Sequence, residues 1–304
     1  MIAKIEDLQA SSDHLNIESP FSLDLHLGDV VTILSQDTLS VNDFMTVLRG
    51  RGVNFSGKIE IKGHDISEKD TYLYYNWVPT VSEDNLISLT VEQYLNFSAE
   101  LYGIDLHYRP YLINESLILT NTQEYRDSVI GAVKDVFILK KIELARALVS
   151  NPYVIFIEDL FQGAYEDKRK SDIVQILQNI RNTGCSLVVG VDSLEFIKNI
   201  TSKIIFFVDN NIFLSGEFKD LQQELDKYKL VQIQLLEDSL NNMLDILEAK
   251  DNIWEIWQHE DDPGVLKFIF RGEDKDLTDL LQEAVNKKCG IVSCYSLDKF
   301  WGRY

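Results

Sequence analysis

The chain has 304 residues, 45% of them hydrophobic, and a formal net charge of −20. This length can bury a large core, with room for one large domain and a small one. The acidic balance argues against nucleic acid as a partner, because phosphate binding needs a basic surface. Apolar runs end after about five residues, whereas a membrane span needs ~20, so no direct membrane insertion is expected. An N-terminus unlike a signal peptide and three cysteines without a CxxC pair favour a reducing, cytoplasmic compartment.

Strand and helix patterns alternate through residues 1–226. Phe21, Leu23, Leu25 and Leu27 alternate with polar residues and predict one face of a strand. Residues 30–34, VVTIL, predict a strand buried on both faces, after a turn at Gly28. The same reasoning gives strands at 59–61, 154–157, 187–191 and 204–208, a hairpin partner at 212–214, and helices at 90–102 and 171–181. The aromatic run at 72–77 is either a buried strand or a partner contact. Together these patterns indicate a layered α/β domain with parallel strands.

Residues 142–159, IELARALVSNPYVIFIED, carry the most information. An amphipathic helix stops at Pro152, a buried strand follows, and Glu158 and Asp159 come at its carboxyl end, where open α/β sheets bind ligands. This segment resembles the one that follows the signature motif in ATP-binding subunits of ABC transporters. The resemblance covers residues 2–214. It implies a P-loop ATPase-like α/β domain over 1–226, with a mixed sheet and a helical subdomain at about 82–145.

The family's phosphate loop has glycines, a lysine that contacts the phosphates and a hydroxyl residue for Mg²⁺. The corresponding residues 35–43 contain no glycine. Val41 stands at the lysine position, and Asn42 and Asp43 stand at the hydroxyl positions. The degenerate loop comprises Ser35, Thr38, Ser40, Val41, Asn42 and Asp43. Its side chains would crowd a phosphate, so we expect a closed vestigial loop and no cofactor. ATP and Mg²⁺ are expected only if this interpretation is wrong.

The other ATP-contacting positions of the family are also altered. The aromatic that stacks on adenine falls near Ser12, the glutamine at Thr80 and the histidine at Asp192. The signature motif falls on Lys134, Asp135, Val136, Phe137 and Ile138. Asp135 would face a phosphate with like charge. The family's acidic pair is Asp then Glu, for Mg²⁺ and for the attacking water, and here the order is reversed. Glu158, Asp159 and Asp192 are therefore interpreted as vestigial, with no catalytic residue expected.

Residues 227–304 form a different pattern. Strands are expected at 231–235, 254–257, 265–270 and 291–295, and helices at 240–247 and 277–285. The order βαββαβ is that of a small ferredoxin-like α+β domain. It resembles the carboxyl-terminal appendage of some exporter-type ABC subunits, and SLDKF at 296–300 resembles the motif that closes such appendages.

Retention of the scaffold together with loss of the ATP-binding residues implies a pseudo-ATPase. In this interpretation the chain docks on a membrane permease, and possibly on a competent ABC ATPase subunit, at the cytoplasmic face of the membrane. Two alternatives stay open: a cytoplasmic scaffold or regulator that kept the fold for protein contacts, and an active ATPase with divergent motifs. Five histidines without ligand spacing give no metal site.

Overall fold

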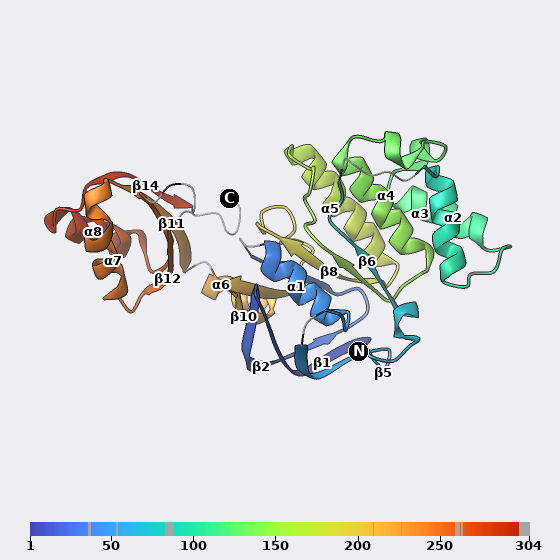
Figure 1. Ribbon diagram of the computed structural model, residues 1–304, viewed down its shortest axis with the longest axis horizontal. Helices are drawn as coiled ribbons and strands as arrows, with labels where there is room; N and C mark the ends of the chain where they lie inside the picture. Colours follow the sequence, from blue (N-terminus) through green and yellow to red (C-terminus); the bar gives the residue numbers. More distant parts are fainter. Residues whose placement is uncertain are drawn as a thin grey trace. The chain divides into compact units, whose positions relative to one another are not determined.

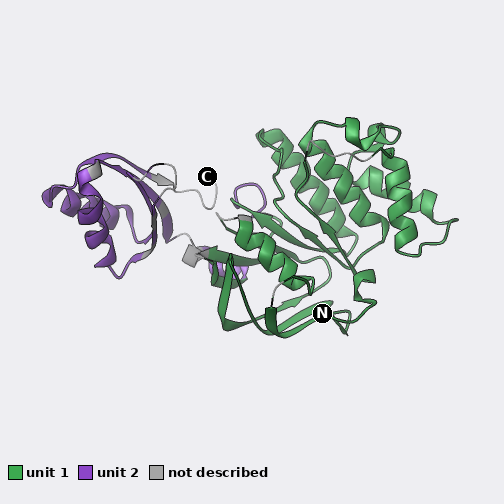
Figure 2. Ribbon diagram, viewed as in Figure 1, with its two compact units in different colours: residues 1–192, 199–216 green, residues 193–198, 217–304 purple. Residues whose placement is uncertain are grey.

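The computed structural model describes residues 1–35, 38–52, 54–82, 88–208, 210–225, 227–258, 262 and 264–297. The chain divides into two compact units, residues 1–192 with 199–216, and residues 193–198 with 217–304 (Figure 2). The sequence places a domain boundary after residue 226, further along the chain than this division, and that boundary stays a prediction. None of the described helices is long and apolar enough to cross a membrane.

The first unit contains a four-stranded sheet in the order β2-β1-β4-β5. Its strands are β1 (Ala3–Ser12), β2 (Leu15–Leu25), β4 (Asn54–Ile61) and β5 (His64–Asp65). Phe21, Leu23 and Leu25 are buried, as their alternation predicts. The inclusion of Leu27 in that face is wrong. The strand ends at Leu25, and Leu27 is 62% exposed in the turn that Gly28 closes with a φ of +75°.

A six-stranded sheet in the order β10-β9-β3-β8-β7-β6 forms the centre of the first unit. Its strands are β3 (Val30–Leu34), β6 (Tyr75–Val78), β7 (Val154–Ile157), β8 (Ser186–Val191), β9 (Lys203–Val208) and β10 (Asn211–Glu217). The strands from β9 to β6 pair in parallel, and β3, β7 and β8 are wholly buried. Of the aromatic run 72–77, only the second half is strand. Thr71–Leu73 is a 3-10 turn, closed by the Tyr74 amide on the Thr71 carbonyl.

Helix α1 (Thr38–Leu48) lies between the two sheets and contributes Phe44, Met45 and Val47 to their common core (Figure 1). Helices α2 (Val91–Leu101), α3 (Arg109–Leu119) and α4 (Val136–Val149) pack side by side as a helical subdomain (Figure 1). The connecting 3-10 turns are Gln123–Tyr125 and Ile130–Ala132. Thr90 caps α2 in a capping box with Gln93, which confirms the predicted cap. Helix α5 (Asp167–Asn182) follows β7.

The second unit contains an antiparallel sheet in the order β12-β13-β11-β14. Its elements are α6 (Phe218–Leu225), β11 (Tyr228–Leu235), a 3-10 turn (Glu237–Ser239), α7 (Leu240–Glu248), β12 (Ile253–Gln258), β13 (Val265–Arg271), α8 (Asp274–Asn286) and β14 (Ile291–Leu297). Phe268 and Phe270 pack against Met243 of α7 and Leu280 of α8. This is the ferredoxin-like order expected from the sequence. Residues 298–300 of the closing motif SLDKF lie outside the described residues.

Candidate functional site

The predicted phosphate-binding loop is largely helical. The expectation of a loop through Asp43 is wrong, because α1 begins at Thr38. With no glycine at 35–43, the backbone lacks the residue that most easily adopts the left-handed conformations of a phosphate nest, and the helix extends instead. Ser35, at the end of β3, is buried, and its amide donates to the Val191 carbonyl at 3.1 Å. Gln36 and Asp37 lie outside the described residues.

The lysine position of the family is filled by a packed apolar side chain. Val41 is 4% exposed and belongs to the core between the sheets. A Cβ built on Gly190, in β8, would lie 2.6 Å from Val41 Cγ1, so the valine occupies the space beside that strand. The preceding Ser40 is also buried, and its hydroxyl donates to Asn210 Oδ1 at 2.7 Å. The described helix α1, Thr38–Leu48, contains no lysine or arginine.

Two other positions that the sequence interpretation treats as vestigial bind each other. The Ser12 hydroxyl, near the expected adenine-stacking position, donates to a carboxylate oxygen of Asp43, at one of the two expected hydroxyl positions. The neighbouring Asn42 is half-buried, and its carbonyl accepts from the Thr46 hydroxyl at 2.8 Å. In the family, the groups at these positions would contact a nucleotide. Here the polar groups form hydrogen bonds with other residues of the chain.

Glu158, at the carboxyl end of β7, is 5% exposed and directed toward β6. Its carboxylate accepts from Trp77 Nε1 at 2.9 Å and from the Thr80 amide at 3.3 Å. Arg49 Nη2 lies 3.6 Å from the same carboxylate, and its guanidinium stacks 4.0 Å from the centre of the Trp77 ring. Burial lowers the pKa of Arg49. The position that holds Mg²⁺ in the family therefore stabilises a buried arginine here.

Lys140, in α4, is completely buried beside this carboxylate, a feature that the sequence interpretation missed. Its ammonium donates to the carbonyl oxygens of Pro79, at 2.8 Å, and of Glu158. Burial lowers its pKa from 10.5 to about 8, although nearby carboxylates, Asp159 first among them, oppose the shift. The sequence feature that could have indicated this buried lysine is the pair Lys140-Lys141 inside an apolar helix.

Asp159 and Asp192 follow neighbouring parallel strands. Asp159 has a φ of +39°, is half-buried, and has a raised pKa. Burial is the main cause; Lys140 opposes it and Asp192 adds to it by like charge. Asp192 is exposed. Across the described residues, no group of three or more His, Cys, Asp or Glu side chains is placed to hold a metal ion.

Residues 134–138, which the sequence interpretation places at the signature motif, span the start of α4. Asp135 is the N-cap, and its carboxylate accepts from the Phe137 amide at 3.0 Å. Both of its oxygens accept from Arg169, each at 2.9 Å. Phe137 is buried, Val136 and Ile138 are half-buried, and Lys134 is exposed. The Asp135 carboxylate therefore already balances the partial positive charge at the N-terminus of α4, and Arg169 pairs with that carboxylate.

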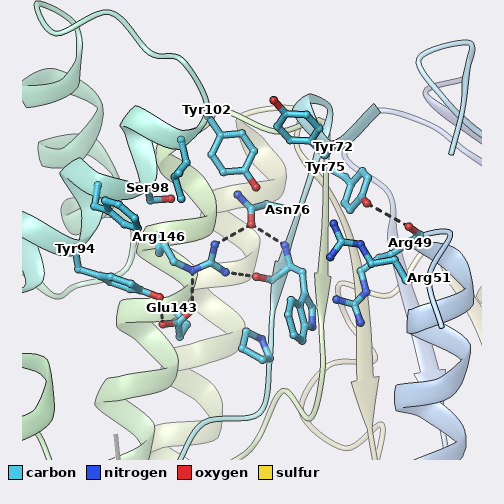
Figure 3. Close-up of a pocket in the computed structure, with 14 residues that line it drawn as sticks. Arg49, Arg51, Tyr72, Tyr75, Asn76, Tyr94, Ser98, Tyr102, Glu143 and Arg146 are labelled. Carbon is cyan, nitrogen blue, oxygen red and sulfur yellow. Dashed lines mark hydrogen bonds and ion pairs between the residues drawn. The ribbon is translucent and has the colours of Figure 1, made fainter. Parts of the chain in front are cut away.

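A cavity of about 440 Å³ lies between α2 and the edge strand β6 (Figure 3). It was not expected from the sequence, although the aromatic run 72–77 supplies part of its wall. The described lining residues are Arg49, Arg51, Tyr72, Tyr75, Asn76, Trp77, Pro79, Tyr94, Phe97, Ser98, Leu101, Tyr102, Glu143 and Arg146. Arg146 donates to Glu143 at 2.7 Å, to Asn76 at 3.1 Å and to the Trp77 carbonyl.

No protein-family model matches the chain. It is 21% identical over 225 residues to the spermidine/putrescine import ATP-binding protein PotA of Bacillus cereus, covering 72% of this chain and 67% of that protein. It is 24% identical over 194 residues to the putative ABC transporter ATP-binding protein TTE0246 of Caldanaerobacter subterraneus, covering 60% and 78%.

Solved structures of ABC transporter ATP-binding subunits have a similar fold. The match to cbiO1 of Clostridium perfringens, part of the ABC transporter complex cbiONQ, has a TM-score of 0.62 at 17% identity and covers 74% of this chain and 91% of that one. An ATP binding subunit of another ABC transporter gives 0.63 at 14% identity, covering 74% and 93%. The chain has the α/β fold of ABC transporter ATP-binding domains, and its sequence is similar to those of ATP-binding subunits.

Proposed function

We propose that the chain is a non-catalytic, ATP-binding-like subunit of an ABC transporter, which docks on a membrane permease or on a competent ATPase subunit. The observation that carries the proposal is Val41. At the position of the phosphate-binding lysine, this chain has an apolar side chain that is 4% exposed and packed in the core. Such a subunit lies at the cytoplasmic face of the membrane through its partners.

Energetics support the loss of ATP binding. A charge-assisted contact to phosphate is worth ~1.5–3 kcal/mol, and the lysine that supplies it in the family is absent. Asp43 adds a negative charge in the helix that would face the nucleotide, and the bond from Ser12 holds that carboxylate in place. Binding would also require the buried Ser40–Asn210 contact to open.

The second half of an ATP site is altered in a similar way. In ABC assemblies, as the resemblance implies, one subunit's ATP contacts the signature motif of the other. Here the corresponding helix end carries Asp135 in a two-bonded pair with Arg169. A partner's phosphate would meet a carboxylate at this point and would have to displace an existing ion pair.

The docking proposal rests on the helical subdomain. Its core is retained, while Leu106, Tyr108 and Tyr111, on α3 and the segment before it, are 66%, 68% and 64% exposed. Exposed large side chains gathered within one short segment, here residues 106–111, are typical of a protein contact. The exporter-type assignment also remains a proposal, supported by the ferredoxin-like second unit alone.

Isothermal titration of the purified full chain with Mg-ATP tests the central statement. We expect no measurable heat of binding, because the lysine and the loop glycines are both absent. PotA of Bacillus cereus, titrated in parallel, is the positive control. A dissociation constant in the micromolar range would contradict the proposal and favour a divergent active ATPase.

A further inference from the structure

Strand β14 forms one edge of the sheet in the second unit (Figure 1), and no described strand pairs with the side of it that faces away from β11. It is seven residues long, and its sequence IVSCYSL contains neither a charged residue nor a proline. Val292 is 58% exposed and Tyr295 is 59% exposed. A long, uncharged, apolar edge of this kind presents unpaired backbone N–H and C=O groups to another strand.

The other edge strands of the described sheets have features that prevent such pairing. Strands β2, β10 and β12 contain charged residues. Strands β5 and β6 have only two and four residues. Charge and short length are common means by which sheets avoid edge-to-edge association. Among the described edge strands β14 alone lacks both, which indicates that this edge has a pairing partner.

Charged side chains of α8 and its ends differ between the two ends of β14. Strands β13 and β14 both end beside the start of β11. The first turn of α8 follows β13 and is acidic, with Asp274 and Asp276. Asp274 pairs with Lys229 of β11, and its side chain is still 90% exposed. Exposed Lys287 and Lys288 lie at the opposite end, directly before β14. Carboxylates therefore flank the end of β14, and ammonium groups flank its beginning.

This arrangement of charge fits a second copy of the same chain. A twofold axis through the middle of β14 pairs the strand with its own copy in antiparallel orientation. The paired strands place no like charges opposite each other, because neither carries a charge. The acidic end of α8 in one copy then lies near the basic end in the other. Repulsion between two chains of net charge −20 opposes the contact, but salt screens it beyond about 8 Å at physiological ionic strength.

We propose that β14 pairs with β14 of a second copy of this chain, antiparallel and centred on Cys294, so that two four-stranded sheets become one continuous sheet. The exposed side chains of Val292 and Tyr295 are covered in the dimer. All residues of this interface belong to the second unit. The dimer requires neither ATP nor a permease, so its failure would leave the proposed docking of the helical subdomain untouched.

Sedimentation equilibrium of the full chain without nucleotide, from roughly 1 to 100 μM, tests the proposal. The mass should rise with concentration toward that of two chains. Val292→Lys and Tyr295→Lys should each weaken the dimer at least about tenfold, because the twofold axis brings two new ammonium groups to the same edge. Leu27→Lys, at a leucine of the first unit that is 62% exposed, is the matched control and should leave the dimer unchanged. Circular dichroism confirms that each variant is folded.

Oxidation by diamide tests the position of the twofold axis. Directly opposite residues of antiparallel strands have Cα atoms about 4.5–5.5 Å apart, a distance that a disulfide spans. Cys294 is half-buried and would lie opposite its own copy. Oxidation should therefore give a disulfide-linked dimer, which Cys294→Ser should not form. Cys289→Ser, at a buried cysteine of the same unit, is the control and should still give the linked dimer.

Three outcomes would overturn the proposal. The first is a mass of one chain over the whole concentration range; slow hydrogen exchange of β14 in that single chain would show that another part of the chain covers the edge. The second is a dimer that both lysine variants leave intact. The third is a dimer that forms only with Mg-ATP, which would indicate association through the first unit.

Discussion

At the residue scale, the positions that our proposal interprets as a vestigial ATP site make contacts within the chain. Val41 packs beside Gly190, Ser12 binds Asp43, and Glu158 binds Trp77. Each pair ties together residues far apart in the sequence and now contributes to the stability of the fold. A single reversion at any of these positions therefore removes a packing or hydrogen-bonding partner without restoring the rest of the ATP site.

Val41→Lys tests this directly. We expect no ATPase activity, because Asn42, Asp43, Asp135 and Asp192 still replace the residues that the family uses. We also expect the free energy of unfolding to fall by at least about 1 kcal/mol, because a buried valine is exchanged for an ammonium. Phosphate release and urea denaturation measure the two effects, with Val41→Met as the apolar control. Phosphate release above a buffer blank would show that the remaining site is competent.

Lys140 predicts a specific pH dependence of stability. Its pKa is lowered from 10.5 to about 8 in the folded chain. Between these values the unfolded chain holds a proton that the folded chain lacks, so this lysine's contribution to the free energy of unfolding rises with pH. The free energies of unfolding of wild type and Lys140→Met should therefore diverge as the pH rises. Relative to the variant, wild type should gain on the order of 2–3 kcal/mol of unfolding free energy between pH 8 and pH 10.5.

The control for that measurement is Lys168→Met, at an exposed lysine of α5. Its stability should run parallel to that of wild type over the same pH range. A constant difference between wild type and Lys140→Met would mean that the ammonium is not held at a depressed pKa.

At the scale of elements, local apolar patterns predicted β3 and β7 to the residue, because each is a short apolar run bounded by turns or proline. The start of α1, the 3-10 turn before β6 and the end of β2 were not predicted, because apolar periodicity does not mark where a helix or strand begins or ends. The cavity and the burial of Lys140 were missed for a related reason. Their residues come from segments far apart in sequence, and periodicity reports only neighbours.

The start of α4 gives a prediction about one element. Asp135→Ala removes the N-cap and the ion pair with Arg169, and should cost about 1–2 kcal/mol of unfolding free energy. Asp135→Asn keeps a capping oxygen and loses only a half-exposed ion pair, which is worth about 0.2–1 kcal/mol. In thermal and urea unfolding, Asp135→Ala should therefore be less stable than Asp135→Asn. Equal losses would show that the Arg169 pair, and not the cap, stabilises the helix start.

At the scale of the whole molecule, the residues at the phosphate-loop position and at the signature-motif position limit how this chain could share an ATP site with a partner subunit. The resemblance implies that each ATP lies between the phosphate loop of one subunit and the signature motif of the other. If this chain paired with one competent ATPase, neither shared site would be complete, because Val41 and Asp135 replace residues on both sides. We therefore expect a partner that turns over slowly, or a complete ATPase pair to which this chain adds as an extra subunit.

Co-expression with any permease and ATPase encoded beside this chain's gene tests that expectation. The chain should copurify with them, and Tyr108→Asp and Tyr111→Asp together should abolish copurification, because both place a charge on the exposed surface of the helical subdomain. Tyr165→Asp, at a tyrosine that is 88% exposed elsewhere in the first unit, is the matched control. ATP hydrolysis by the assembly should depend only on the partner's own phosphate-loop lysine. A chain that stays alone in these experiments is not a transporter subunit, and its retained fold then serves a scaffold or regulatory role.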